Sequence, residues 1–288
     1  MRPIVFLAVD ERTSSLTADD QIFADALARA GLAPQPLRWG ALVNPGSTIV
    51  IRSTWDYVER PAHFAQWLDH LDAQQALVLN ATKTLRWSMH KGYLRDLALD
   101  GVATVDTDVV RRGESCSLRE IMERRQWRDV VIKPAVGGTS RLTVHYDEIG
   151  HEAASEHLLK LLANEDVVVQ PYLPSITDVG EISVIAIGGD VHMALVKTAK
   201  PGEWRVQADF GGTCQLTALT GEIRNAAVQA LAAVSPTPAY ARVDLVRGED
   251  GMLQLLELEL VEPELFFRLD PTLAERFARH LASRLGAR

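Results

Sequence analysis

The sequence contains little cysteine and no long apolar run. Its 288 residues include only 2 cysteines, and Cys116 and Cys214 stand far apart without forming a CxxC pair. This spacing excludes a disulfide scaffold and a cysteine-based zinc site, and it is typical of a cytoplasmic protein in a reducing environment. No stretch reaches the roughly 18 apolar residues that a membrane-spanning helix needs, so we expect no membrane partner.

An excess of positive charge is also absent. Lysine and arginine together number 30 against 38 aspartates and glutamates, which gives a formal net charge of −8. A nucleic acid is therefore not expected as the main partner. The motifs GxxxxGK[ST], GxGxxG, HExxH and GxSxG do not occur either. Their absence excludes the usual signatures of P-loop nucleotide binding, dinucleotide binding, zinc peptidases and serine hydrolases.

The residues that are present predict a globular protein with a parallel α/β domain at its N-terminus. Apolar residues make up 47% and charged residues 24%, and the length favours one large domain or two to three small ones. Strands and helices alternate over residues 1–82, a rhythm that favours a parallel sheet. We expect strands at 4–9, 48–51 and 76–79, and helices at 19–30 and 61–72.

The pattern changes after residue 82. Long β segments dominate residues 181–260, so we predict an α+β region with mainly antiparallel sheets. Ser117 and Glu120 form a capping box, and Asp270 with Pro271 caps the last helix. The remaining elements are expected as helices at 86–99, 152–163 and 220–234, and as strands at 130–133 and 167–170.

A β-hairpin near the C-terminus carries a set of carboxylates. The turn residues 249–251 separate two apolar strands, which places Asp244 opposite Glu257. Glu257 and Glu259 are two residues apart and therefore share a face of the strand. Crowded carboxylates favour a neutralising cation, and an all-oxygen set suits Mg²⁺. The alternative is a solvated strand face whose carboxylates form salt bridges.

A lysine and a glycine-bearing loop follow each other in the middle of the chain. Lys133 ends an apolar strand, and a lysine beside free backbone N–H groups can bind phosphate oxygens. An ordinary hairpin end would look similar. The loop residues concerned are Gly137, Gly138, Thr139 and Ser140.

A third feature is the strand over residues 167–170, which ends at Pro171 and Tyr172. The main-chain groups at such a strand end could bind a planar base, and Asp178 or Glu181 follows at a distance suited to ribose hydroxyls. An ordinary strand exit is the alternative, and the sequence does not decide between the two acids.

The order of these features resembles that of the ATP-grasp superfamily, specifically its glutathione-synthetase-like and ribosomal-protein glutamate-ligase-like branch. The resemblance covers about residues 86–268 and implies an ATP-grasp fold, with ATP held between two α+β subdomains. It divides the chain into an N-terminal α/β domain (1–82), a linker helix region (83–108), a lid subdomain (109–172) and a catalytic subdomain (173–288).

The resemblance also implies roles for individual residues. Two lysines would contact the ATP phosphates, and basic residues of a β segment would contact the transferred phosphate. The glycine pair Gly211 and Gly212 would present N–H groups to a tetrahedral oxyanion. The implied sets are Lys91 and Lys133 for ATP; Gln170, Pro171, Tyr172 and Leu173 for adenine; Arg205 and Lys197 for the transferred phosphate; and Asp244, Glu257 and Glu259 for metal. The last metal ligand is usually Asn in that family, so Glu259 departs from the pattern.

The N-terminal segment 52–57 and the later segment 257–263 resemble a narrower subfamily, which includes the O-ureidoserine cyclo-ligase of D-cycloserine biosynthesis. In the segment 52–57 we expect a substrate site in which Arg52 binds a carboxylate, Asp56 an ammonium group, and the aromatic residues form a wall. A packed loop with an internal Arg–Asp pair is the alternative. The candidate residues are Arg52, Ser53, Trp55, Asp56 and Tyr57.

Together these features imply an ATP- and Mg²⁺-dependent ligase that activates the carboxylate of a small amino-acid-like substrate as an acyl phosphate and forms ADP. Two Mg²⁺ ions are expected, with Mn²⁺ as a substitute, and a homodimer is compatible with the resemblance. The nucleophile would lie on the same substrate, giving ring closure, or on a second amino acid or peptide. A non-catalytic ATP-binding module is the alternative from another class.

Overall fold

The structure is a computed structural model that describes residues 2–147 and 150–286 and places three β-sheets around a common centre. The N-terminal sheet is parallel, with strand order β2-β1-β3-β4, which confirms the predicted α/β pattern. Its elements are β1 (Ile4–Val9), α1 (Ala18–Arg29), β2 (Ala33–Arg38), β3 (Thr48–Ser53), the 3₁₀ turn η1 (Trp55–Glu59), α2 (Pro61–Ala73) and β4 (Leu77–Leu79).

Strand β2 was not predicted from the sequence. It contains Pro34 and Pro36, and proline interrupts the alternation that marks a strand. Proline lacks the N–H group that a strand donates to its neighbours. Among the strands of the described residues, however, β2 pairs only with β1 and lies at the edge of the sheet. The edge position therefore tolerates both prolines.

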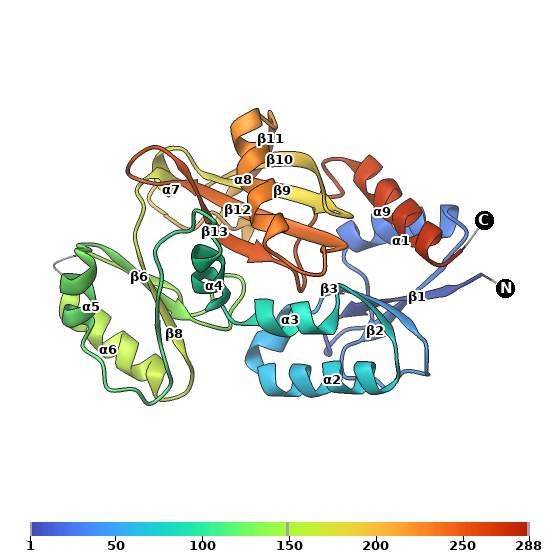
Figure 1. Ribbon diagram of the computed structural model, residues 1–288, viewed down its shortest axis with the longest axis horizontal. Helices are drawn as coiled ribbons and strands as arrows, with labels where there is room; N and C mark the ends of the chain where they lie inside the picture. Colours follow the sequence, from blue (N-terminus) through green and yellow to red (C-terminus); the bar gives the residue numbers. More distant parts are fainter. Residues whose placement is uncertain (1, 148–149, 287–288) are drawn as a thin grey trace.

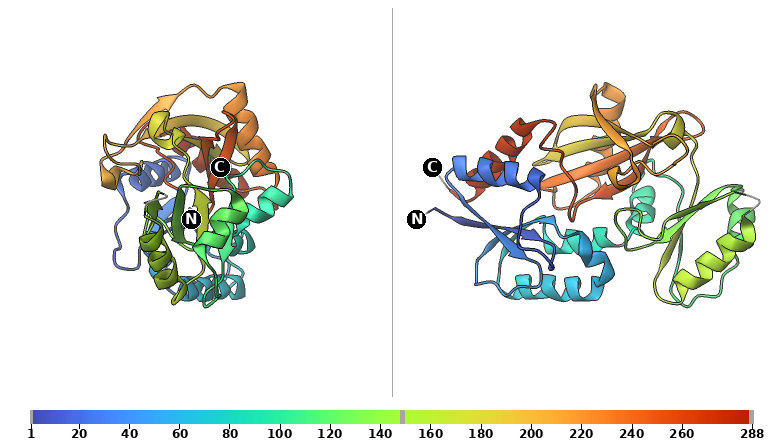
Figure 2. Two further views of the ribbon diagram at one scale, coloured as in Figure 1. Left: turned by 90° about the vertical axis from the view of Figure 1, so that its left-hand side faces the viewer. Right: turned by 180° about the vertical axis from the view of Figure 1, so that it is seen from behind.

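The second sheet is antiparallel, with strand order β5-β8-β6-β7. Two helices cover one of its faces through a shared apolar core that includes Ile121, Ile132 and Leu158. Figure 2 shows this unit, called the lid below, standing beside the N-terminal domain. Its elements are β5 (Asp108–Val110), α5 (Leu118–Arg125), β6 (Val130–Pro134), β7 (Val144–Tyr146), α6 (His151–Leu162) and β8 (Val167–Pro171).

The third sheet has five antiparallel strands in the order β11-β10-β9-β12-β13. It confirms the predicted antiparallel character of the second part of the chain. Asp244 lies opposite Glu257, as predicted, next to an irregularity in the register. The elements are α7 (Ser175–Asp178), β9 (Glu181–Ile187), β10 (Asp190–Thr198), η2 (Ala208–Phe210), β11 (Thr213–Thr217), α8 (Gly221–Ala232), β12 (Tyr240–Arg247) and β13 (Leu253–Glu259).

The prediction of a single helix at 86–99 is wrong. The chain forms two helices, α3 (Thr82–Met89) and α4 (Tyr93–Leu99), separated by residues 90–92. At this break the backbone N–H of Lys91 donates to the carbonyl of Ala135, 2.8 Å away. The break therefore attaches Lys91 to the end of strand β6, beside the lid loop.

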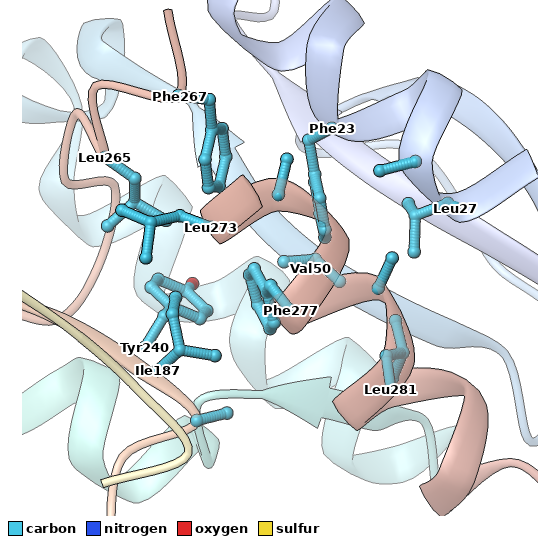
Figure 3. Packing of buried hydrophobic residues seen from close by; sticks show 14 of the residues in the cluster. Phe23, Leu27, Val50, Ile187, Tyr240, Leu265, Phe267, Leu273, Phe277 and Leu281 are labelled. Carbon is cyan, nitrogen blue, oxygen red and sulfur yellow. The ribbon is translucent and has the colours of Figure 1, made fainter. Parts of the chain in front are cut away.

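The last helix, α9 (Pro271–Arg284), packs against α1 rather than only against its own sheet. Figure 3 shows Phe23 of α1 facing Phe277 of α9, with ring centroids 4.6 Å apart. Asp270 caps α9, as predicted, by accepting from the N–H of Thr272. The chain therefore ties its C-terminal helix to its N-terminal domain. Over the described residues, no helix is long and apolar enough to cross a membrane.

Candidate active site

A cavity of about 420 Å³ opens where the three units meet. Trp55 comes from the N-terminal domain, Lys133 from the lid, and Asp244 from the five-stranded sheet. Most of the predicted site residues line it, although they come from widely separated parts of the chain. Those that do are Trp55, Lys91, Lys133, Gly137, Gly138, Thr139, Ser140, Gln170, Pro171, Leu173, Glu181, Lys197, Arg205, Gly212, Asp244, Glu257 and Glu259.

Two buried lysines lie at the lid side of this cavity. Lys91 Nζ lies 2.7 Å from Glu257 Oε1 and 2.6 Å from the carbonyl oxygen of Gly137. Lys133, on strand β6, has no carboxylate within ion-pair distance among the described residues. Burial lowers the pKa of Lys133 to about 8, with Glu257 opposing the shift. Lys133 is therefore a cation without a partner, which an anionic ligand would satisfy.

The loop after β6 has an unusual backbone. Thr139 and Ser140 have φ values of 48° and 53°, in the left-handed region that non-glycine residues seldom adopt. Within the part of the chain that the structure describes, the N–H groups of residues 137–140 donate to no protein acceptor. They are available to phosphate oxygens, in a loop whose backbone strain is a recurrent feature of ligand-binding sites.

The end of strand β8 contributes three of its four predicted residues to the cavity. The buried side chain of Gln170 donates to the hydroxyl of Thr107, while Tyr172 turns away and stacks on His145 with ring centroids 3.8 Å apart. Of the two acids proposed for a ribose, Glu181 lines the cavity and Asp178 is exposed outside it.

The three carboxylates of the hairpin are each held by cations rather than by one another. Asp244 pairs with Arg242 and with Lys197, and Glu259 pairs with Arg242. Burial opposes ionisation of Asp244, yet Arg242 and Lys197 lower its pKa to about 2. Burial raises the pKa of Glu259 to about 7. In the described ranges, no three acidic, histidine or cysteine side chains form a ready-made metal cluster.

The donor set nevertheless suits a hard cation. Carboxylate oxygens are the ligands that Mg²⁺ prefers. The pKa of Glu259 is raised mainly by burial and further by Asp244 and Glu257, and a nearby cation would favour its ionised form. A bound cation would then neutralise the carboxylates together with Arg242, a residue that the sequence analysis did not identify. Because Arg242 and Asp244 are two apart on one strand, the alternation of side chains could have placed both on the same face.

Strand β10 and the segment that follows it carry the predicted catalytic residues. Arg205 lines the cavity, forms a two-pronged pair with Glu203, and lies 3.6 Å from the ring centroid of Phe210. Lys197 is buried, with Nζ 2.5 Å from Glu181 Oε1. Both side chains are therefore positioned by protein groups before any ligand enters.

The role expected for Gly211 and Gly212 is wrong in this structure. Their N–H groups donate to the carbonyls of Ala208 and Gln207, so neither is free for an oxyanion. Gly211 has a φ of 83°, and a Cβ on Gly212 would lie 2.1 Å from the carbonyl oxygen of Val206. These glycines are needed for a tight turn.

The prediction that Arg52 and Asp56 bind the substrate is also wrong. Arg52 Nε donates to Asp20 over 2.8 Å, and both side chains are almost fully buried. Asp56 instead accepts from the indole of Trp39 over 2.6 Å. Neither residue lines the cavity, nor do Ser53 and Tyr57, which are buried inside the N-terminal domain. Only Trp55 of this set, half-exposed, reaches the cavity.

Comparison with known proteins gives matches along most of the chain. Residues 4–80 match the family described as D-cycloserine synthetase DcsG, N-terminal domain, and residues 102–237 match that described as prokaryotic glutathione synthetase, ATP-grasp domain. The chain is 34% identical to the cycloserine biosynthesis protein DcsG of Streptomyces lavendulae, over 82% of this chain and 83% of that protein. A probable alpha-L-glutamate ligase of Shewanella is 33% identical over 35% of the chain.

Solved structures agree with these matches. The crystal structure of D-cycloserine synthetase DcsG superposes with a TM-score of 0.88 at 32% identity, over 98% of this chain and 99% of that one. The D-alanine–D-alanine ligase of Bacillus anthracis complexed with ATP gives a TM-score of 0.68 at 14% identity, over 99% and 97% of the two chains, which concerns the fold alone. The predicted ATP-grasp fold is confirmed.

Proposed function

The chain belongs to the ATP-grasp ligases related to D-cycloserine synthetase and is an ADP-forming ligase; on this premise we propose that it phosphorylates the carboxylate of a small amino-acid-like substrate and closes a ring. The observation that carries the proposal is the cavity itself. It brings two buried lysines, a loop with free N–H groups and an arginine–carboxylate cluster within reach of one small molecule.

Lys91, Lys133 and the loop 137–140 would bind the phosphates of ATP. Lys133 lacks a carboxylate partner in the described part of the chain, so phosphate oxygens would complete its surroundings. Pro171 and Leu173 would contact the base, and Glu181, which lines the cavity, would bind the ribose in preference to the exposed Asp178.

The hairpin carboxylates Asp244, Glu257 and Glu259 would bind Mg²⁺. We propose two Mg²⁺ ions at full occupancy. The ATP-grasp ligase PsnB has been crystallised with Mg and ADP. When bound, Mg²⁺ supplies positive charge that stabilises the phosphoryl group during transfer. The chain's own contribution is that Arg242 keeps Asp244, and Lys91 keeps Glu257, ionised and oriented.

Arg205 and Lys197 would offset the charge that spreads over the transferred phosphoryl group. The substrate carboxylate would become an acyl phosphate, and a nitrogen of the same molecule would attack the acyl carbon and displace phosphate. No protein nucleophile is required.

An assay of ADP release tests this function. With O-ureido-D-serine as sole substrate, we expect ADP and a cyclic product in equal amounts, with no need for a second amino acid. ADP release that depends on adding glutamate or another amino acid would instead indicate an intermolecular ligase. Absence of ADP with O-ureido-D-serine and with a panel of amino acids would contradict the proposal.

Replacement of Arg205 by Ala should lower kcat by roughly 100- to 1,000-fold and leave the ATP KM nearly unchanged. The reason is that Arg205 would interact with the phosphoryl group during its transfer. Steady-state kinetics with ATP varied would measure both. Arg247 is a matched control, since it forms a similar two-pronged pair with Glu222 on the surface, and R247A should retain activity. A raised ATP KM with normal kcat in R205A would contradict the assigned role.

The affinity for ATP should fall as the pH rises above about 8. Below that value Lys133 is protonated in the free protein. Above that pH the lysine is neutral, so ATP binding must be accompanied by uptake of one proton. The affinity for ATP then declines with a slope that approaches tenfold per pH unit. Calorimetric titrations from about pH 7 to 9.5 would measure this. The K133R variant, whose charge is permanent, should show little decline, and an equal slope in both proteins would exclude Lys133 as its source.

A further inference from the structure

Glu262 occupies a distinctive place at the mouth of the cavity. It follows strand β13 by three residues, and its side chain lines the cavity. Its backbone carbonyl accepts from the indole N–H of Trp55, 3.3 Å away. Glu262 Oε1 also lies close to the lid loop, since a Cβ atom added to Gly138 would be 4.0 Å from it. Its carboxylate therefore lies where the N-terminal domain, the lid and the large sheet meet.

This carboxylate lacks the cation that its neighbours have. Lys91 is paired with Glu257, and Arg242 with Asp244 and Glu259. Within residues 2–147 and 150–286, no lysine, arginine or histidine lies within ion-pair distance of Glu262. Burial, reinforced by Glu259, raises the pKa of Glu262 to about 8. With this pKa the carboxyl group is largely protonated at neutral pH in the free protein, and a cationic part of a ligand would favour its ionised form and pair with it.

The surroundings favour an ammonium group as that cation. Trp55 contacts Glu262, lines the cavity and is about half-exposed. An indole is the aromatic group that attracts cations most strongly. A carboxylate and an indole together satisfy the donors and the charge of a primary ammonium. Mg²⁺ would instead require several oxygen ligands, and the next acid along the chain, Glu264, is already paired with Arg268.

We propose that Glu262 binds the α-ammonium group of the substrate and so selects an amino acid over the corresponding acid without an amino group. The assignment rests on the proposed function. It replaces Asp56, whose carboxylate is committed to Trp39 inside the N-terminal domain. Trp55, which belongs to the same predicted segment 52–57, would still contact the substrate.

The test compares two substrates in two proteins. The probes are O-ureido-D-serine and its analogue without the α-amino group, with ADP release measured in the wild type and in E262Q. For O-ureido-D-serine we expect the KM to rise roughly 10- to 100-fold in E262Q, the size of a lost charge-assisted hydrogen bond, with the ATP KM unchanged. For the analogue, the two proteins should have the same KM. Glu249→Gln, at an exposed residue of the hairpin turn that does not line the cavity, serves as the control and should resemble the wild type with both probes.

Three outcomes would overturn the assignment. An unchanged KM for O-ureido-D-serine in E262Q, with normal ADP release by the wild type, would refute the role of Glu262 and leave the proposed function intact. An equal loss with both probes would show a role in folding or in ATP binding. No ADP from the wild type with either probe would refute the proposed function, and the assignment with it.

Discussion

Replacement of Glu257 by Gln is expected to lower kcat for ADP formation by at least about 1,000-fold while the protein stays folded. Glu257 lies opposite Asp244 in the hairpin, and its carboxylate lies 2.7 Å from Lys91 Nζ. The change preserves shape and removes one negative charge. It would therefore weaken the proposed Mg²⁺ site and release Lys91 from its partner at the same time. Steady-state ADP release at saturating Mg²⁺ and ATP, together with the melting temperature, would measure the effect.

Glu249 provides a control on the same hairpin, because it lies exposed in the turn before Gly251. E249Q removes the same charge at a distance from the cavity and should retain full activity. An E257Q variant that keeps its activity at saturating Mg²⁺ would remove Glu257 from the metal site. Recovery of activity at higher Mg²⁺ would instead support weakened metal binding.

The hairpin could be predicted from the sequence because its determinants are local. The turn residues 249–251 fix which residues face each other, and the alternation of side chains along a strand fixes which share a face. The predicted pairing of Asp244 with Glu257 is confirmed, but it also depends on the irregularity beside Asp244. Leu245 pairs with Leu255, so an unbroken register would place Asp244 opposite Leu256. The cap of α9 at Asp270 was likewise visible because a capping residue and its partner lie within one helical turn.

The errors concern features decided by distant residues. Arg52 and Asp56 are four residues apart, and their sequence suggests an arginine and an acid acting together. The fold separates them by giving Arg52 a partner 32 residues away in Asp20, and Asp56 a partner 17 residues away in Trp39. Nothing within the segment 52–57 identifies those partners. Similarly, nothing in the helical pattern of 86–99 indicates that the backbone N–H of Lys91 donates to the distant carbonyl of Ala135.

The consequence for Arg52 is a prediction opposite to the one that its sequence context suggests. Replacement of Arg52 by Ala should destabilise the protein by about 3 to 5 kcal/mol, because it leaves the charge of Asp20 buried without its partner. It also removes a donor to the carbonyl of Pro263 and a cation 5.6 Å from the ring centroid of Phe267. The melting temperature should fall by roughly 10 °C, as measured by calorimetry.

A stability effect alone would not separate an internal ion pair from a substrate clamp, so substrate kinetics must accompany it. At a temperature where R52A remains folded, we expect its substrate KM and ATP KM to match those of the wild type, since Arg52 does not reach the cavity. Arg279 is the control, because its pair with Glu275 on α9 is exposed, and R279A should change stability by less than about 0.5 kcal/mol. An R52A protein with a normal melting temperature and a strongly raised substrate KM would contradict the internal pair. It would return Arg52 to the substrate site, and the contact between Arg52 and Asp20 would then have to open when the substrate binds.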